Sequence, residues 1–433
     1  MIKKINTVSF YTLGCRLNQS ETAVIQRTFE VDGYRVVDFN EPADMVVINT
    51  CTVTEGGDAD TRRLVNKVNR INPQAKIALV GCQAQTQKEK LTDLPGVRYV
   101  VGNAKKMDLA TIVRETLQQD SAQVITPTIE RKSFTMPLAG IDEKHTRANI
   151  KIQDGCDFFC SFCEIPYARG RARSRQFDDI LKEARILTEA GHQEIVITGI
   201  NVGTYQEEGK TLLDVIDALE QLQDLKRIRI SSIEPTTIPL TLLDKMADKN
   251  SKLCRYLHIP LQSGSDTVLS LMKRKYTTEE FYQFISRAFE TVKDICIGTD
   301  VIVGFPGETQ ADFETTFERL QEWPVHYFHV FSYSNRTMNK SRHHGEQVPP
   351  AVIQERSKIL RDLSYRKRRL YFQGLLNACQ DVLFEQKKNG LWNGLTDHYA
   401  RVFVESNEDL SNQMRRVQLN HLNSLEILGN LHG

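Results

Sequence analysis

Three closely spaced cysteines constrain this chain more than any other feature. Cys156, Cys160 and Cys163 follow one another in the spacing Cys-x3-Cys-x2-Cys. Three thiolates at this spacing can bind three irons of a four-iron, four-sulfur cluster and leave the fourth iron open to a small chelating ligand. The alternative is a zinc knuckle, but zinc normally takes four ligands, usually as two separated pairs. Because the nearest histidines are His145 and His192, the spacing favours the cluster.

The residues that follow the triplet repeat a strand and a helix. Six strand-like segments occur between residues 149 and 335, with amphipathic helical patterns between them. Six such units predict a partial (β/α)6 barrel, in which the chemistry belongs at the carboxyl ends of the strands. The triplet follows the first strand and is therefore expected on that face. The predicted strands begin near Ile150, Glu194, Ile228, Tyr256, Thr299 and His326.

A second group of cysteines lies in residues 7–103, where strands and helices also alternate. This alternation predicts an open parallel sheet covered by helices. Cys15, Cys51 and Cys82 each come just after the carboxyl end of a predicted strand. Since these ends share one edge of a parallel sheet, we expect the three cysteines to converge and to hold a second cluster. The alternative is that they are small core residues.

The rest of the chain indicates a linker and a third domain. After residue 370, strand-like segments alternate with the turn signals Asn389-Gly390 and Asn393-Gly394. This pattern predicts a small all-β barrel, a common RNA-binding appendage. The fold class is therefore α/β, with an open parallel domain, a partial barrel and a β-barrel in that order. The predicted boundaries are 3–115 for the first domain, 116–145 for the linker, 146–369 for the second domain and 370–433 for the third.

Composition sets broad limits on location and partners. The chain has 433 residues, of which 40 % are hydrophobic and 26 % charged, as in ordinary soluble proteins. Its formal net charge of +1 neither supports nor excludes a nucleic-acid partner. No apolar run approaches the ~18 residues that span a membrane. Nine cysteines without a signal peptide predict a reducing, cytoplasmic environment, in which Cys254, Cys296 and Cys379 are structural.

Several motifs extend beyond the cysteines. On these motifs the chain resembles the radical S-adenosylmethionine (SAM) methylthiotransferases along its whole length. The resemblance implies two [4Fe-4S] clusters, a central radical SAM barrel and a C-terminal TRAM domain. The motifs include Thr12-Leu13-Gly14-Cys15, Asn49-Thr50-Cys51-Thr52-Val53-Thr54, Gly81-Cys82-Gln83, Cys163-Glu164-Ile165-Pro166-Tyr167-Ala168-Arg169-Gly170, Leu261-Gln262-Ser263-Gly264 and Val303-Gly304-Phe305-Pro306-Gly307-Glu308.

Polar and glycine residues at the strand ends are predicted to hold SAM. The backbone at the end of the second strand is expected to meet the amino group of SAM, and the third and fourth strand ends are expected to hold its ribose and amino-acid portions. The fifth strand end suits the adenine because its side chains are apolar and its backbone is accessible. The predicted SAM-binding residues are Thr198, Gly199, Glu234, Gln262, Ser263, Val303, Gly304 and Phe331.

A row of arginines follows the triplet. Arg169, Arg171, Arg173 and Arg175 occupy every second position. In an extended segment they would face one surface, where guanidinium groups can bind phosphates or a carboxylate. We therefore predict that the row binds the substrate. The alternative is a solvated loop.

The resemblance also implies a reaction. Within the family, the chain is most similar to the branch that methylthiolates C2 of N6-threonylcarbamoyladenosine at position 37 in the tRNA anticodon loop. The C2–H of adenine is not acidic, so it must leave as a hydrogen atom, which a carbon radical derived from SAM can take. By resemblance, the second cluster supplies sulfur and an electron donor such as a flavodoxin supplies the electron.

Three other functions remain open at this stage. One is methylthiolation of isopentenyladenosine in tRNA, whose apolar group gives the arginine row no partner. Another is methylthiolation of an aspartate in a ribosomal protein, which an acidic C-terminal surface would favour. Residues 367–433 contain eight Lys and Arg against seven Asp and Glu, so that surface is not clearly acidic. The last is a non-catalytic iron–sulfur protein that binds RNA and never cleaves SAM.

Overall fold

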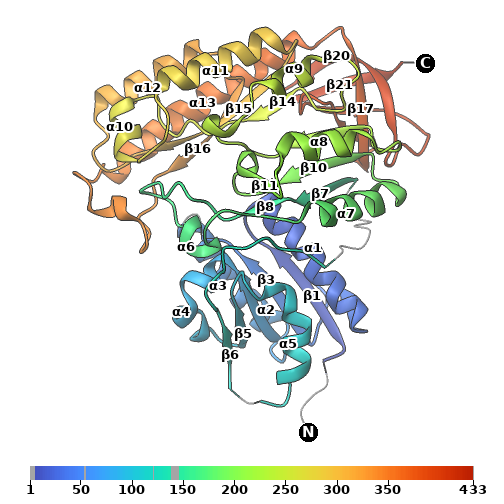
Figure 1. Ribbon diagram of the computed structural model, residues 1–433, viewed down its shortest axis with the longest axis vertical. Helices are drawn as coiled ribbons and strands as arrows, with labels where there is room; N and C mark the ends of the chain where they lie inside the picture. Colours follow the sequence, from blue (N-terminus) through green and yellow to red (C-terminus); the bar gives the residue numbers. More distant parts are fainter. Residues whose placement is uncertain (1–4, 53–54, 120, 138–145, 433) are drawn as a thin grey trace.

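The computed structural model describes residues 5–52, 55–119, 121–137 and 146–432. Val53, Thr54 and the predicted linker residues 138–145 lie outside the described residues. Figure 1 shows a parallel sheet with helices at the amino-terminal end, a partial barrel above it, and a small β-barrel beside the partial barrel. This architecture confirms the predicted fold class.

Six parallel strands form the amino-terminal sheet. They are β1 (Thr7–Thr12), β2 (Arg35–Val37), β3 (Met45–Thr50), β4 (Lys76–Gly81), β5 (Val97–Val101) and β6 (Gln123–Ile125), in the order β2-β1-β3-β4-β5-β6. Helices α1 (Arg16–Val31) and α5 (Leu109–Thr116) pack on one face. Helices α2 (Glu55–Ile71), α3 (Cys82–Thr86) and α4 (Lys88–Thr92) pack on the other. The central strands β3 and β4 are mostly apolar and almost entirely buried because helices cover both faces.

Two details of this domain differ from the prediction. The strand β6 lies within the predicted linker 116–145, yet it pairs with β5 and extends the sheet. Helix α1 begins at Arg16, immediately after Cys15, whereas the sequence pattern predicts a helical stretch only from Ser20 to Val31. The first turn is polar because it faces the site described below, so hydrophobic periodicity could not reveal it.

The second domain has the six predicted strands. They form two parallel sheets, ordered β13-β10-β7 and β14-β15-β16, which adjoin at the bridge between Ile228 and Leu253. The strands are β7 (Arg147–Lys151), β10 (Glu194–Thr198), β13 (Arg227–Ile230), β14 (Tyr256–His258), β15 (Cys296–Val303) and β16 (Tyr327–Ser332). The accompanying helices are α7 (Phe177–Glu189), α8 (Leu212–Glu220), α9 (Thr241–Ala247), α10 (Asp266–Leu271), α11 (Thr278–Thr291), α12 (Gln310–Glu322) and α13 (Pro350–Gly374).

The last domain is a closed five-stranded barrel. Its strands are β17 (Cys379–Lys388), β18 (Leu391–Leu395), β19 (Arg401–Val404), β20 (Met414–Asn423) and β21 (Glu426–Leu431). The predicted turn at Asn389-Gly390 is confirmed, since both residues have positive φ and join β17 to β18. The predicted turn at Asn393-Gly394 is wrong, because both residues lie inside β18. A Cβ at Gly394 would lie 2.5 Å from the Leu383 carbonyl oxygen, so the glycine permits close strand packing.

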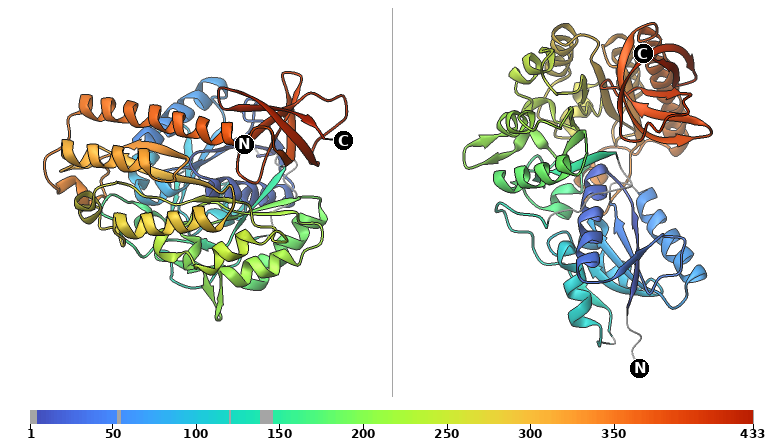
Figure 2. Two further views of the ribbon diagram at one scale, coloured as in Figure 1. Left: turned by 90° about the horizontal axis from the view of Figure 1, so that it is seen from above. Right: turned by 90° about the vertical axis from the view of Figure 1, so that its right-hand side faces the viewer.

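The small barrel packs against the amino ends of the partial-barrel strands (Figure 2). Arg227 donates from Nη1 to the Leu395 carbonyl oxygen at 2.8 Å, and Arg229 donates to the Asp397 carbonyl oxygen at 2.8 Å. The ring of Tyr399 lies 4.8 Å from that of Tyr256. These contacts occupy that end of the partial barrel, and the opposite, carboxyl ends of its strands face the amino-terminal domain.

No helix in the described parts of the chain is both long enough and apolar enough to cross a bilayer.

Candidate active site between two cysteine triads

The triplet loop follows β7 and the short strand β8 (Gln153–Asp154) at the carboxyl face of the partial barrel. The backbone N–H groups of Phe158 and Ile165 donate to the sulfurs of Cys156 and Cys163, each at 3.4 Å. Arg274 donates from Nη1 to the Cys160 sulfur at 3.2 Å. All three thiols therefore receive a hydrogen bond, as thiolate ligands of an iron–sulfur cluster commonly do.

Burial raises the pKa values of the three thiols. The pKa of Cys156 rises to about 11, and the neighbouring Cys160 and Glu234 add to the effect of burial. The pKa of Cys160 and that of Cys163 also rise, with burial as the largest cause. A thiol binds metal as the thiolate. These buried sulfurs would therefore lose their protons when iron binds to them.

Arg274 links the triplet to one of the predicted SAM-binding residues. Its guanidinium contacts the Glu234 carboxylate and donates to the Tyr276 hydroxyl at 3.0 Å, besides its bond to Cys160. Burial raises the pKa of Glu234, although Arg274 opposes that effect. Glu234 thus lies beside the triplet loop, at the face of the partial barrel where we predicted that it binds SAM.

The second triad lies at the carboxyl ends of three neighbouring strands. Cys15 follows β1, Cys51 follows β3, and Cys82 follows β4, so the structure brings them to one sheet edge. Gly14 has φ +91°, and a Cβ there would lie 2.9 Å from the Cys51 sulfur. Because that close approach excludes a side chain, the glycine lets the Cys15 loop reach the Cys51 loop.

Two asparagines hold these cysteine loops. The Asn18 amide donates to the carbonyl oxygens of Leu13 and Thr50, at 2.7 and 3.1 Å, and so ties the Cys15 loop to the Cys51 loop. The side-chain amide nitrogen of Asn103 donates a hydrogen bond to the Cys82 sulfur at 3.6 Å. Three sulfurs on one edge, in loops that asparagine side chains hold in place, are a suitable donor set for a second iron–sulfur cluster.

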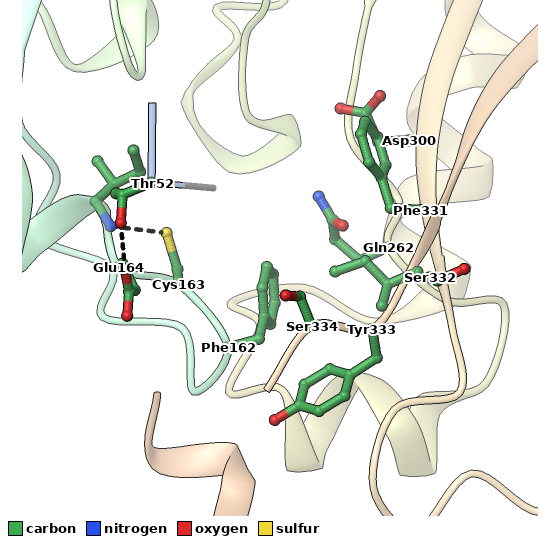
Figure 3. Close-up of a pocket in the computed structure, with 12 residues that line it drawn as sticks. Thr52, Phe162, Cys163, Glu164, Gln262, Asp300, Phe331, Ser332, Tyr333 and Ser334 are labelled. Carbon is green, nitrogen blue, oxygen red and sulfur yellow. Dashed lines mark hydrogen bonds between the residues drawn. The ribbon is translucent and has the colours of Figure 1, made fainter. Parts of the chain in front are cut away.

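A cavity lies beside the loops of both triads (Figure 3). On one side it is lined by Thr52, which follows Cys51, and by Cys163 of the triplet. On the other side, Gln262 and Phe331 come from the partial barrel. The other lining residues are Phe162, Glu164, Ile165, Asp300, Ile302, Ser332, Tyr333 and Ser334. A ligand in this cavity would therefore contact the loops that carry both cysteine triads.

The predicted SAM-binding residues have different surroundings. Gln262 and Phe331 line the cavity, whereas the Ser263 hydroxyl faces the Thr316 hydroxyl of α12 at 3.4 Å. Gly304 packs beneath α13, where a Cβ would lie 2.3 Å from Ile353. Thr198 and Gly199 end β10, Glu234 lies beside Arg274, and Val303 is buried at the end of β15. Their role in binding SAM stays a prediction.

The four arginines do not line one surface, so that expectation is wrong. Helix α6 (Ile165–Arg169) ends at Arg169, and Gly170 turns the chain with φ +76°. Arg171 remains 55 % exposed in its side chain and stacks 4.5 Å from the Phe159 ring. Its Nη1 also lies 3.4 Å from Asp157 Oδ1. The other three pair with carboxylates that are less exposed: Arg169 with Glu21 and Asp154, Arg173 with Asp154, and Arg175 with Asp179 and Glu183. Substrate binding by the row stays a prediction.

Sequence reasoning missed a bridge beside the cavity. Thr52 donates to Glu164 at 2.6 Å, and Arg336 donates to Thr52 at 3.0 Å. The position of Glu164, directly after Cys163, was a possible signal, but nothing in the sequence connects Arg336 with either cysteine loop. Arg274 was missed for the same reason, since its role depends on a fold contact with Cys160.

Comparison with known proteins identifies the family. Residues 150–320 match the Radical SAM superfamily, and residues 7–102 match the uncharacterized protein family UPF0004. A Bacillus subtilis protein, threonylcarbamoyladenosine tRNA methylthiotransferase MtaB, is 36 % identical over 425 residues, covering 95 % of this chain and 93 % of that protein. The chain belongs to the radical SAM methylthiotransferases.

Other relatives and folds agree with this membership. A relative from Thermodesulfovibrio yellowstonii, tRNA-2-methylthio-N(6)-dimethylallyladenosine synthase, is 32 % identical over 403 residues, covering 91 % of this chain and 91 % of that protein. The Kitasatospora setae radical SAM methyltransferase TsrM has a similar fold, with a TM-score of 0.59 and 16 % identity, over 76 % of this chain and 75 % of that one. This methylthiotransferase is therefore an enzyme with the radical SAM fold.

Membership implies one [4Fe-4S] cluster and SAM. The residues fit the cluster, because the three thiols of the triplet lie in one loop and each receives a hydrogen bond. When bound at the reduced cluster, SAM supplies a carbon radical that can abstract a hydrogen atom. The chain's own contribution is a set of side chains that can position a ligand in the cavity beside Cys163.

Proposed function

We propose that this methylthiotransferase acts on C2 of N6-threonylcarbamoyladenosine at position 37 of tRNA. We also propose that Cys15, Cys51 and Cys82 hold a second [4Fe-4S] cluster, at which the sulfur is donated. The observation that carries the proposal is a cavity that Thr52, the neighbour of Cys51, and Cys163 of the triplet line on the same side. A base in that cavity would lie beside the loops of both proposed cluster sites.

The cavity walls suit a nucleobase. Phe331 exposes 39 % of its surface and Phe162 lines the cavity, so aromatic rings are available for stacking. Gln262 offers an amide that can both donate to and accept from a base edge. The target lies in an anticodon loop, where an unpaired base can leave its stack at low cost. The partial barrel would thus bind one extruded adenine.

The remaining partners are part of the same proposal. The C-terminal barrel, a TRAM-like domain, would bind the tRNA outside the cavity. A one-electron donor such as a flavodoxin would reduce the cluster, and the reaction would take place in the cytoplasm, where tRNA and such donors occur. Two relatives named threonylcarbamoyladenosine tRNA methylthiotransferase MtaB, from Bacillus subtilis and Aquifex aeolicus, are 36 and 37 % identical to this chain. The dimethylallyladenosine synthases are 31 to 32 % identical, which supports the threonylcarbamoyl substrate.

Nucleoside mass spectrometry of tRNA tests the proposal. In a strain that lacks this gene, 2-methylthio-N6-threonylcarbamoyladenosine should disappear while the 2-methylthio derivative of isopentenyladenosine remains. The gene supplied on a plasmid should restore the missing nucleoside. Loss of the isopentenyl derivative instead would assign the other tRNA substrate. Unchanged levels of both would contradict a tRNA substrate and favour the ribosomal protein or a non-catalytic role.

Arg171 is the most exposed arginine of the row, and because its partner Asp157 is also part-exposed, a substrate carboxylate can reach the guanidinium. The Arg171→Glu variant should lower kcat/KM for tRNA with threonylcarbamoyladenosine about 10- to 100-fold, because a charge-assisted hydrogen bond contributes roughly 1.5–3 kcal/mol. Steady-state assays would compare this tRNA with one carrying unmodified adenosine. Arg185→Glu, on the exposed face of α7, is the control. An equal loss on both tRNAs would exclude carboxylate recognition by Arg171.

A further inference from the structure

Six charged side chains form a buried ion cluster where the amino-terminal domain meets the partial barrel. Five of them are at most 4 % exposed in their side chains, and Arg173 is 14 % exposed. Four carry positive charge and two carry negative charge, so the cluster has a net positive charge. The members are Glu21 of α1, Lys106 of the 3-10 helix η1 (Lys106–Asp108), Lys151 of β7, Asp154 of β8, Arg169 of α6, and Arg173 of β9 (Arg173–Ser174).

The two carboxylates are each shared among several cations. Glu21 lies 2.7 Å from Lys151 Nζ and 2.9 Å from Arg169 Nη2, and it also contacts Lys106. Asp154 lies 2.7 Å from Lys151 Nζ and 3.0 Å from both Arg169 and Arg173. Burial raises the pKa of Glu21, but Arg169, Lys106 and Lys151 outweigh it and hold the pKa well below its usual range. Both domains therefore contribute charges to one network.

Hydrogen bonds connect this ion cluster to all three amino-terminal cysteine loops. Arg169 Nη2 donates to Asn18 Oδ1 at 2.6 Å, and Asn18 in turn holds the loops of Cys15 and Cys51. Lys106 Nζ donates to Asn103 Oδ1 at 2.7 Å, and the Asn103 amide points to the Cys82 sulfur. The side chain of Asn18 thus connects Arg169 to the loops of Cys15 and Cys51, and the side chain of Asn103 connects Lys106 to Cys82.

Buried charge of one sign is costly unless an opposite charge lies close to it. The two carboxylates offset only part of the charge on Lys106, Lys151, Arg169 and Arg173. A [4Fe-4S]2+ centre with three thiolates carries net negative charge, and reduction makes it more negative. Because the reduction potential of such a centre depends on nearby charge and hydrogen bonds, surrounding cations favour the reduced form.

We propose that the buried ion cluster is the counter-charge of an iron–sulfur centre at Cys15, Cys51 and Cys82 and sets its reduction potential. The inference rests on the second cluster of the proposed function. It assigns positioning roles to Arg169 and Lys106, which act on the centre through Asn18 and Asn103. It also explains why the arginine after the triplet loop turns toward the amino-terminal domain instead of the substrate.

Redox titration of variants with opposite changes in charge tests this role. The background is the full chain with Cys156, Cys160 and Cys163 replaced by alanine, so that only the amino-terminal site can hold a cluster. In this background Lys106→Gln should lower the midpoint potential, and Glu21→Gln should raise it. Dithionite reduces the centre by one electron, and electron paramagnetic resonance follows the reduced form. The pH is kept below the pKa of Lys106, which burial lowers to about 8.

A purely structural role would not give shifts of opposite sign. Lys105→Gln is the matched control, because Lys105 is 51 % exposed and pairs with Asp108 at the surface, and it should leave the potential unchanged. If Lys106→Gln does not fold, Arg173→Gln removes a positive charge from a more accessible position and should also lower the potential. Shifts in the same direction, or no shift, would overturn the proposal. A background chain that binds no iron would instead refute the second cluster itself.

Discussion

Replacing Cys15, Cys51 and Cys82 with alanine should abolish methylthiolation and leave SAM cleavage intact. The triplet at the partial barrel keeps its own hydrogen bonds from Phe158, Ile165 and Arg274 in this variant. It should therefore still bind one cluster, with about 4 irons per chain instead of about 8. Iron analysis, 5′-deoxyadenosine formation and methylthiolated nucleoside in tRNA are the three measurements.

The reciprocal variant provides the control. With Cys156, Cys160 and Cys163 replaced by alanine, the chain should again bind about 4 irons but form neither 5′-deoxyadenosine nor product. Alanine at Cys254, Cys296 and Cys379 should change neither iron content nor product, since Cys254 and Cys296 pack in an aromatic cluster and Cys379 bonds to Gln418. If the first variant kept its full iron content, Cys15, Cys51 and Cys82 would not be cluster ligands.

Strand ends explain why both cysteine sites could be located from the sequence. In parallel sheets, the residues after neighbouring strands meet at one edge, and this rule needs only the strand positions. Cys15, Cys51 and Cys82 follow β1, β3 and β4, which are adjacent in the sheet. Apolar runs identified these strands reliably. The edge strands β2 and β6 have only three residues each, too few to form such a run, and they were missed.

The arginine row shows where local sequence is insufficient. Alternation predicted one shared face, but the direction of each side chain depends on distant partners. Arg169 pairs with Glu21, which is 148 positions away in the chain, and Arg175 pairs with Glu183 of α7. A buried carboxylate attracts a guanidinium more strongly than solvent does once the charge is desolvated. Lys151 inside the apolar strand Ile150-Lys151-Ile152 was the one local sign of a buried charge.

Arg336→Ala should uncouple SAM cleavage from methylthiolation. Arg336 is buried, donates to Asp58 of α2 at 2.6 Å, and holds Thr52, which bonds to Glu164 beside Cys163. It thereby fixes the distance between the Cys51 and Cys163 loops. Because small misplacements of reacting groups can cost about 100-fold in rate, we expect product per SAM cleaved to fall by roughly that factor.

The measurement is the ratio of methylthiolated nucleoside to 5′-deoxyadenosine under single-turnover conditions. Arg342→Ala is the matched control, because Arg342 is exposed on the same segment. Removing one partner of a buried ion pair can cost about 3–5 kcal/mol of folding free energy, so Arg336→Lys is tested as well. It keeps the charge but not the forked geometry, and should give an intermediate ratio. Equal losses of both products would leave the ratio unchanged and would show that the bridge supports folding alone. If neither product fell, the buried ion cluster at Glu21 and Asp154 would be what aligns the two loops.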